Sequence, residues 1–140
     1  GRGVAAAFML GAVGVQLGTR FLVAKECGVH QNYKSKVLKA NDIATMTTGK
    51  RLGHPVRSIK NPYTKEYFRL EYSSISDEEL EAYGRGALRR AAVEGDEKTG
   101  CFLAGQIAGM VNREQPAKEI IEEIFREAED VLNGATKWVK

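Results

Sequence analysis

A short apolar run, AVGVQL at residues 12–17, constrains the fold more than any other part of the sequence. It follows a segment of small, helix-favouring residues, GVAAAFMLG at 3–11, in which Gly11 is suited to the C-terminal cap. A nearly continuous apolar run of this length predicts a strand that is buried on both faces. Strands of that kind belong to parallel sheets flanked by helices, so the sequence predicts an α/β fold.

Gly18 and Thr19 follow this predicted strand at its carboxyl end, the place where α/β folds bind ligands, and a helix is expected to resume over residues 20–26. Backbone N–H groups at a helix start attract anions, and Gly18 has no side chain to block their approach. The pair is a candidate phosphate site, although a plain strand-end turn gives the same pattern. A second small-residue segment contains Gly105 and Gln106, which could contact a polar ring edge or serve a tight helix crossing.

The rest of the chain predicts helices joined by one small sheet. Helices are expected at 31–40, from Asn61-Pro62, from the capping box Ser76–Glu79 to Val93, and from Pro116 to Asn133-Gly134, with two strands within 43–48 and 56–60. Apolar spacing places Leu88, Ile121, Phe125 and Val131 inward among others, and Lys34, Lys36 and Lys39 toward water.

Composition narrows the classes of function. The chain has 140 residues, 43% of them hydrophobic, and a formal net charge of +3, which is too small an excess for binding through many phosphate contacts of a nucleic acid. Its longest apolar stretch, Val4–Ala12, is too short to cross a bilayer, so we expect a cytoplasmic protein without membrane attachment. Cys27 and Cys101 form no ligand cluster and are expected to be reduced, structural thiols. His30 and His54 lack metal or triad spacing, so surface or capping roles are expected.

Basic residues gather in two parts of the sequence. Arg85, Arg89 and Arg90 share one side of their predicted helix, and a middle group contains Lys50, Arg51, Arg57, Lys60 and Lys65. A solvated surface explains both groups, and an acidic partner or a phosphorylated cofactor is the sharper alternative.

Several segments together resemble one enzyme family. GRGVAAAFMLGAVGVQLGTRFLVAKEC is similar to the region around the last two barrel strands of the flavin-dependent enoyl-acyl-carrier-protein reductases, and of their relatives the nitronate monooxygenases (2-nitropropane dioxygenase-like). The segments HQNYKSKVLKA, TTGKRLGHPVRSIKN, YGRGALRRAAVEGDEKTG and AGQIAGMV continue the resemblance in the same order. GHPVRSIKN and the YGRGAL to GDEKTG block fit the reductase branch better.

The resemblance implies an FMN enzyme on a TIM barrel. In that family NAD(P)H reduces the flavin, which passes hydride to an enoyl thioester carried on acyl carrier protein in bacterial fatty-acid synthesis. The flavin phosphate lies between the loops after the seventh and eighth strands, and the second loop matches Gly18 and Thr19. AGQIAG lies near the flavin in relatives, which makes Gly105 and Gln106 further cofactor-binding candidates. The acidic carrier would give the basic surface around Arg57, Lys60, Arg85 and Arg89 a partner.

The resemblance also implies that part of the enzyme precedes Gly1. A Gly-Gly phosphate loop and the active-site histidine belong to that upstream part, and neither His30 nor His54 matches it, so no catalytic residue is assigned. We expect a C-terminal fragment that is inactive alone: residues 1–28 end a TIM (β/α)8 barrel, and 29–140 form an α+β appendage with C-terminal helices. A barrel strand without its neighbours needs new partners, which predicts self-association into a homo-oligomer.

Two other functions remain open from the sequence. One is a nitronate monooxygenase, which keeps FMN and uses oxygen on a nitronate. The other is a helical interaction module that binds an acidic partner and no flavin.

Overall fold

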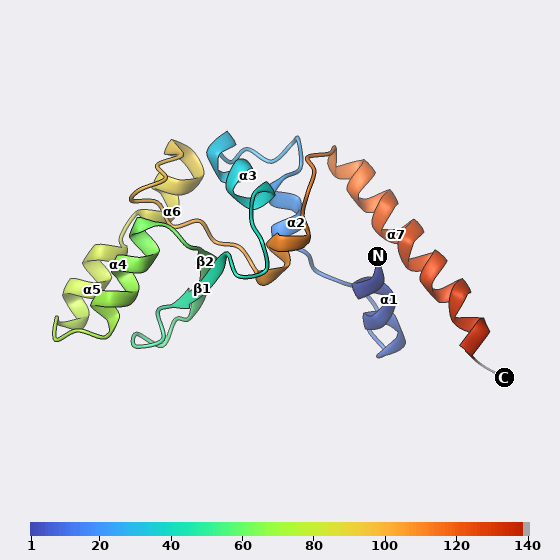
Figure 1. Cartoon of the computed structure of the whole chain (residues 1–140), viewed down its shortest axis with the longest axis horizontal. Helices are drawn as coiled ribbons and strands as arrows, with labels where there is room; N and C mark the ends of the chain where they lie inside the picture. Colours follow the sequence, from blue (N-terminus) through green and yellow to red (C-terminus); the bar gives the residue numbers. More distant parts are fainter. Residues whose placement is uncertain (139–140) are drawn as a thin grey trace.

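The computed structural model describes residues 1–138 and is mostly helical, with one two-stranded sheet (Figure 1). None of its helices is long and apolar enough to cross a membrane. The elements in chain order are α1 (Arg2–Met9), α2 (Thr19–Leu22), α3 (Gln31–Leu38), β1 (Thr45–Thr48), β2 (Val56–Ile59), α4 (Pro62–Glu71), α5 (Asp77–Gly84), α6 (Ala87–Arg89), the π-helical turn η1 (Arg90–Glu94), the 3₁₀ helix η2 (Gln106–Met110), α7 (Ala117–Gly134) and η3 (Ala135–Trp138).

Helices α1 and α7 pack together as an arm at one end of the molecule, away from α4, α5 and α6 (Figure 1). Val4, Ala5 and Ala128 are buried between them, and the rings of Phe8 and Phe125 stack with centroids 6.5 Å apart. The predicted starts and ends of both helices are confirmed, including Gly11 with its positive φ of 90° just after α1.

The prediction that α7 buries its whole apolar stripe is wrong. Ile121, Phe125 and Val131 are 47%, 50% and 42% exposed, whereas Ile120 and Ala128 are buried. The reason is that α1, with eight residues, is much shorter than α7, with 18, and covers only a narrow strip of it.

The predicted strand at residues 12–17 is not formed. The segment is irregular and exposed, and Val13 is fully exposed to solvent. A strand needs at least one neighbouring strand that bonds its backbone, and within residues 1–138 the only named strands, β1 and β2, pair with each other elsewhere. The predicted α/β class is therefore confirmed only in part: the described residues are mostly helical and contain one small two-stranded sheet.

The central body is built around the small sheet and α3. β1 and β2 pair antiparallel with Thr45 opposite Ile59, which confirms the predicted two-strand element. Residues 102–104 extend the sheet, because the N–H of Ile59 donates to Phe102 O (2.8 Å) and that of Ala104 to Arg57 O (3.1 Å). The main hydrophobic core is formed by residues of the sheet, of α3 and of the segments packed against them. Its fully buried side chains include Val23, Val37, Ala91, Phe102 and Ala108.

Helices α4 and α5 form a second core around tyrosines. Tyr63, Tyr67 and Leu80 are buried, and Tyr83 stacks on Tyr63 with centroids 5.3 Å apart. The predicted caps are confirmed: the Asn61 side chain accepts from Thr64 N (2.9 Å), and Ser76 and Glu79 form the reciprocal capping box.

The helix predicted to run from residue 77 to Val93 is interrupted. It ends at Gly84, Gly86 adopts a φ of +74°, and the chain resumes as α6 and η1 before ending at Gly95. A left-handed residue cannot continue a right-handed helix, so the second half turns away and Leu88 is 49% exposed instead of buried.

Lys34 corrects another prediction. Its side chain was expected in water, as are Lys36 and Lys39, but Lys34 is only 4% exposed. The ammonium donates to Ala24 O (2.7 Å) and to Glu114 Oε1 (2.9 Å). Helix α3 is covered on a second side by α2 and by the segment before α7, so its polar face is not all solvated. Lys39 is exposed and Lys36 partly so.

Candidate functional site

Gly18 and Thr19 stand at the start of α2, as expected, but the helix is shorter than predicted. It contains four residues, Thr19–Leu22, instead of continuing to residue 26. So short a helix has few aligned peptide dipoles, and the anion attraction expected from a helix start is correspondingly weak. Gly18 is exposed, and a Cβ added to it would meet no atom within 4 Å, so the approach to its backbone is open.

Thr19 joins the two candidate segments. The backbone N–H of Gly105 donates to Thr19 Oγ1 at 3.0 Å, and a Cβ on Gly105 would lie 3.6 Å from the same oxygen. Because Thr19 Oγ1 accepts this bond, its own proton remains for another acceptor, and residues 1–138 supply none. Together, Gly18, Thr19 and Gly105 form a small polar site at which an anion can accept hydrogen bonds.

Gln106 lies next to Gly105 in sequence, but it takes no part in the hydrogen bond between Gly105 and Thr19. It is the first residue of η2, and its side chain is exposed and makes no hydrogen bond within the described part of the chain. Its neighbour Ile107 is 52% exposed. The segment thus presents an unpaired amide beside Gly105, and the predicted contact with a cofactor stays a prediction.

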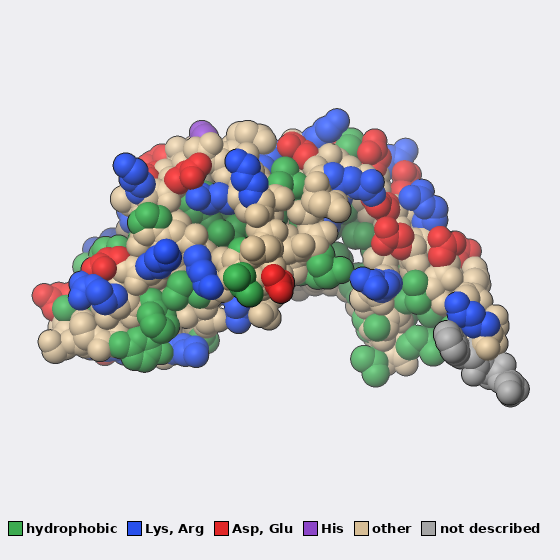
Figure 2. Space-filling view, viewed as in Figure 1, with side chains coloured by type: hydrophobic (Ala, Val, Ile, Leu, Met, Phe, Trp, Pro, Cys, Tyr) green, Lys and Arg blue, Asp and Glu red, His purple; other side chains and the backbone are tan. Residues whose placement is uncertain are grey.

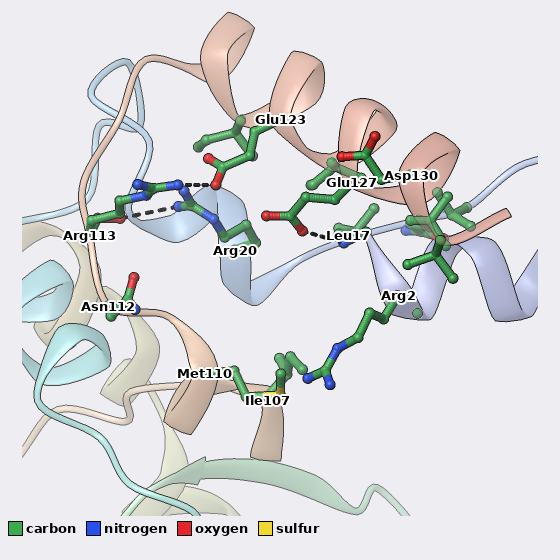
Figure 3. Close-up of a pocket in the computed structure, with 18 residues that line it drawn as sticks. Arg2, Leu17, Arg20, Ile107, Met110, Asn112, Arg113, Glu123, Glu127 and Asp130 are labelled. Carbon is green, nitrogen blue, oxygen red and sulfur yellow. Dashed lines mark hydrogen bonds and ion pairs between the residues drawn. The ribbon is translucent and has the colours of Figure 1, made fainter. Parts of the chain in front are cut away.

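A cavity of about 910 Å³ lies between the α1–α7 arm and the body, next to this site. Figure 2 shows the hollow between the two parts, and Figure 3 shows its walls. Leu17 and Arg20, which flank Gly18 and Thr19, line one side of it, and Ile107 and Met110 of η2 line another. The four predicted site residues are not themselves in the wall, but Leu17, Arg20 and Ile107, which adjoin Gly18, Thr19 and Gln106 in sequence, are. The volume is in the range of small-molecule and cofactor sites.

Arg20 holds the first turn of α2 to the segment before α7. Its guanidinium donates to Arg113 O (3.3 Å) and to Gln115 Oε1. Arg113 donates to the same Gln115 oxygen (3.0 Å). Figure 3 shows the ion pair of Arg113 with Glu123 and the bond from Arg20 to the Arg113 backbone oxygen. Burial lowers the pKa of Arg20, the positive charge of Arg113 lowers it further, and Glu127 opposes the shift. A guanidinium stays protonated nonetheless, so the site has a fixed positive charge beside Thr19.

The histidines occupy the capping and surface positions that were expected, and Cys101 lies in the tyrosine core. His30 caps α3, accepting from Asn32 N at its Nδ1 (3.1 Å), and His54 is exposed in the loop between β1 and β2. Cys27 and Cys101 are unpaired thiols, and burial raises the pKa of Cys101, which keeps it protonated. No group of three or more possible metal ligands occurs in residues 1–138.

The four cations of the predicted basic surface, Arg57, Lys60, Arg85 and Arg89, differ in their contacts, and Arg89 alone among them has an ion pair in residues 1–138. Arg57 bonds Thr45 Oγ1 (3.2 Å), and Arg89 lies 3.7 Å from Glu94. Lys60 and Arg85 are exposed without an ion pair in the described residues. In Figure 2 Lys and Arg side chains are interspersed with Asp and Glu over the visible face.

Comparison with known proteins decides the family. The family model described as nitronate monooxygenase matches residues 1–127. The chain belongs to the nitronate monooxygenase family. This confirms the resemblance noted in the sequence, and members of the family, which includes FabK, are FMN-dependent oxidoreductases.

Individual family members are similar along nearly the whole chain. A probable nitronate monooxygenase of Staphylococcus saprophyticus is 31% identical over 134 residues, covering 95% of this chain and 37% of the relative. The structure of FabK from Thermotoga maritima is 41% identical with a TM-score of 0.94, covering 99% of this chain and 44% of that one. A nitroalkane oxidase from Streptomyces ansochromogenes is 26% identical with a TM-score of 0.75, covering 94% and 37%. The chain thus spans less than half the length of these family members.

The residues present fit a phosphate-bearing cofactor such as FMN. The site offers a hydroxyl proton on Thr19 without an acceptor, an open backbone at Gly18 and the cation of Arg20 next in sequence. The first hydrogen bond of α2 runs from Phe21 N to Gly18 O (3.0 Å). The backbone N–H groups that precede Phe21 therefore have no acceptor within that helix. Phosphate oxygens accept bonds from all of these donors.

Sequence reasoning missed the cluster of Arg20, Arg113, Gln115 and Glu123. No local spacing reveals it, because Arg20 and Gln115 are 95 positions apart. The one available signal was the position of Arg20 directly after Thr19.

Proposed function

We propose that this chain forms part of an FMN-dependent enoyl-acyl-carrier-protein reductase, in which NAD(P)H reduces the flavin. The similarity to FabK from Thermotoga maritima, 41% identity over 99% of this chain, is the observation that carries the proposal. The segments GHPVRSIKN and YGRGAL to GDEKTG support the same branch. The proposal includes the TIM barrel, whose other parts would cover the exposed apolar residues of segment 12–17.

The proposed role of this chain is to bind the phosphate end of FMN. Thr19 donates its free hydroxyl proton to a phosphate oxygen, while the bond from Gly105 N–H fixes the hydroxyl oxygen. Gly18 lets the phosphate approach the backbone closely. Arg20 supplies a positive charge that stabilises the phosphate dianion. When bound, FMN supplies the hydride transfer chemistry; Gln106 and the apolar side chains of Ile107 and Met110 would face its ring from η2.

Activity of the complete gene product tests the proposal. A purified, flavin-loaded protein should oxidise NADH or NADPH when given a 2-butenoyl thioester, and the saturated thioester should accumulate in equal amount. Nitronate-dependent oxygen uptake without thioester reduction would contradict the reductase proposal.

A nitronate monooxygenase is the second candidate. The curated relatives at 27–31% identity bear that name, and the family model bears it too. Both activities use FMN, so the phosphate site described here is common to them, and the two-substrate comparison separates them. A protein with no flavin in either assay would favour a non-catalytic interaction module.

The acidic acyl carrier protein is the proposed macromolecular partner. Lys60 and Arg85 are exposed cations without ion pairs in residues 1–138, and Arg57 and Arg89 lie near them in sequence. Opposite charges raise the association rate of such partners. The double variant Lys60→Glu with Arg85→Glu should raise the KM for carrier-linked substrate but not for a small thioester. Lys118→Glu with Arg126→Glu on the exposed face of α7 is the matched control, and equal effects on both substrates would contradict this docking surface.

Self-association is also proposed. Met9, Leu10 and Val13 are 73%, 89% and 105% exposed, which is an apolar surface that needs covering. This chain lacks the other parts of the proposed barrel, so the uncovered surface predicts a homo-oligomer of the 140-residue chain by itself. A monomer of that chain at high concentration in analytical ultracentrifugation would contradict the prediction.

A further inference from the structure

Gln115 is the centre of a polar network that links three segments. Its side-chain oxygen accepts from Arg20 and from Arg113 Nε (3.0 Å), and its amide nitrogen donates to Glu123 Oε2 (3.0 Å). Its backbone oxygen accepts from Lys25 N (2.9 Å). Both polar groups of the Gln115 side chain and its backbone oxygen are therefore engaged: with Arg20 of α2, with Arg113, with Lys25 after α2, and with Glu123 of α7.

The network supplies hydrogen-bond acceptors between two positive charges that lie close together. Two guanidinium groups, those of Arg20 and Arg113, meet at one place, and like charges repel unless acceptors separate them. The Gln115 oxygen serves both, and Glu123 pairs with Arg113. Arg20 is thereby held facing the segment before α7 instead of swinging into solvent.

The bonds to Arg20 act directly on the candidate anion site, because Arg20 is the residue after Thr19. Thr19 is held on its other side by Gly105 N–H at 3.0 Å. The first turn of α2 is thus fixed from two directions, by η2 through Thr19 and by the 113–115 segment through Arg20. Loss of either restraint lets a helix of four residues move easily.

We infer that Gln115 is a positioning residue for the phosphate site: by bonding Arg20 and Arg113 together it sets the orientation of the Gly18 and Thr19 backbone that receives the phosphate. The inference depends on the proposed function in one respect: it takes the phosphate to be that of FMN. Gln115 does not touch the phosphate itself, and it acts through Arg20.

The test compares binding of FMN with binding of riboflavin, which has the same ring and ribityl chain but no phosphate. In the complete gene product, Gln115→Met keeps the side-chain length and removes both the acceptor and the donor. FMN should bind about tenfold more weakly in this variant, as expected for loss of hydrogen bonds to a charged group. Riboflavin affinity should change by less than about twofold, because the ring contacts are untouched.

A swap of the two side chains provides rescue. Gln115→Glu combined with Glu123→Gln keeps an acceptor for both guanidiniums, keeps a donor between the two positions and leaves the net charge unchanged. FMN affinity in this double variant should return to within about threefold of the original. Lys118→Met is the matched control, since Lys118 is an exposed residue in the first turn of α7 whose ammonium forms an ion pair with Glu122 and, in the described residues, no polar contact with the Gln115 network.

Two outcomes would overturn the inference. Equal loss of FMN and riboflavin affinity in Gln115→Met would show a general structural role, and unchanged FMN affinity would show no role in the site. If the unsubstituted protein binds riboflavin and FMN with equal affinity, there is no phosphate site here, and the inference is wrong. Failure of the proposed reductase activity is distinguishable, because these measurements use no substrate of either enzyme.

Discussion

The backbone N–H of Gly105 donates to the side-chain oxygen of Thr19 at 3.0 Å, although the two residues are 86 positions apart. This bond brings together the two segments that the sequence marks as candidate cofactor contacts. It also fixes the direction of the Thr19 hydroxyl, because an oxygen that accepts from Gly105 is left with its own proton to donate elsewhere.

Removal of the Thr19 hydroxyl should weaken both the fold and the cofactor site. Thr19→Val is nearly isosteric but leaves the Gly105 N–H without an acceptor, so the free energy of unfolding should fall by about 1–2 kcal/mol. FMN affinity should fall about tenfold in the complete gene product. Denaturant titration and flavin titration measure the two effects. Thr19→Ser keeps the hydroxyl and should stay close to the original in both; an equally weak Thr19→Ser would argue against the hydroxyl as the cause.

The two glycines of the AGQIAG segment should respond differently to alanine. A Cβ at Gly109 would lie 2.8 Å from Asn41 C and 2.9 Å from Asp42 N, closer than backbone atoms allow. Gly109→Ala should therefore destabilise the protein by about 1–3 kcal/mol. At Gly105 the nearest atoms are 3.6 Å or more away, so Gly105→Ala should cost less than about 0.5 kcal/mol. Thermal and denaturant unfolding of both variants checks this order, and the reverse order would contradict the packing described here.

Lys34 should be a stabilising residue despite its charge. Lys34→Met removes two charge-assisted hydrogen bonds, to Ala24 O and to Glu114, and leaves Ala24 O with only the bond from Cys27 N (3.1 Å). The expected loss of unfolding free energy is about 2–3 kcal/mol. Lys39→Met changes an exposed lysine just after the same helix and should be close to neutral. Similar losses for the two variants would place Lys34 in solvent after all.

The start of α7 should respond to acid through Glu26. Its carboxylate accepts from Ala117 N at 2.8 Å, and that bond is the main cause that lowers the pKa of Glu26 below its ordinary value of 4.5. A group with a lowered folded pKa stabilises the fold fully above pH 4.5, and the contribution disappears as pH falls through the folded pKa. Unfolding curves between pH 7 and 3 should show this loss. In Glu26→Gln the same part of the pH dependence should be missing, and an unchanged pH profile would refute the assignment to Glu26.

Local signals predicted the local structure well. Asn61-Pro62, the Ser76–Glu79 capping box and Pro116 each begin a helix where expected, because caps act over four residues and need no distant partner. The same locality explains the small sheet formed by β1 and β2. Gly86 shows the limit: the helix was predicted to continue to Val93, but the left-handed turn at Gly86 interrupts it.

The errors concern features that depend on distant parts of the chain. Residues 12–17 have the composition of a buried strand, yet strands form only beside other strands, and none adjoins them in residues 1–138. Lys34 is buried by segments that its own helix pattern cannot reveal. In the site, Gly18, Thr19 and Gly105 were named in advance, whereas Gln115 was missed because its partners lie on segments far away in the sequence.

The position of the FMN phosphate in a crystal structure of the complete gene product tests the central claim most directly. The account predicts a phosphate oxygen within hydrogen-bond distance of Thr19 Oγ1, about 2.5–3.0 Å, with the Gly105 N–H still bonded to the same hydroxyl. A flavin whose phosphate lies beyond reach of both Gly18 and Thr19 would contradict it.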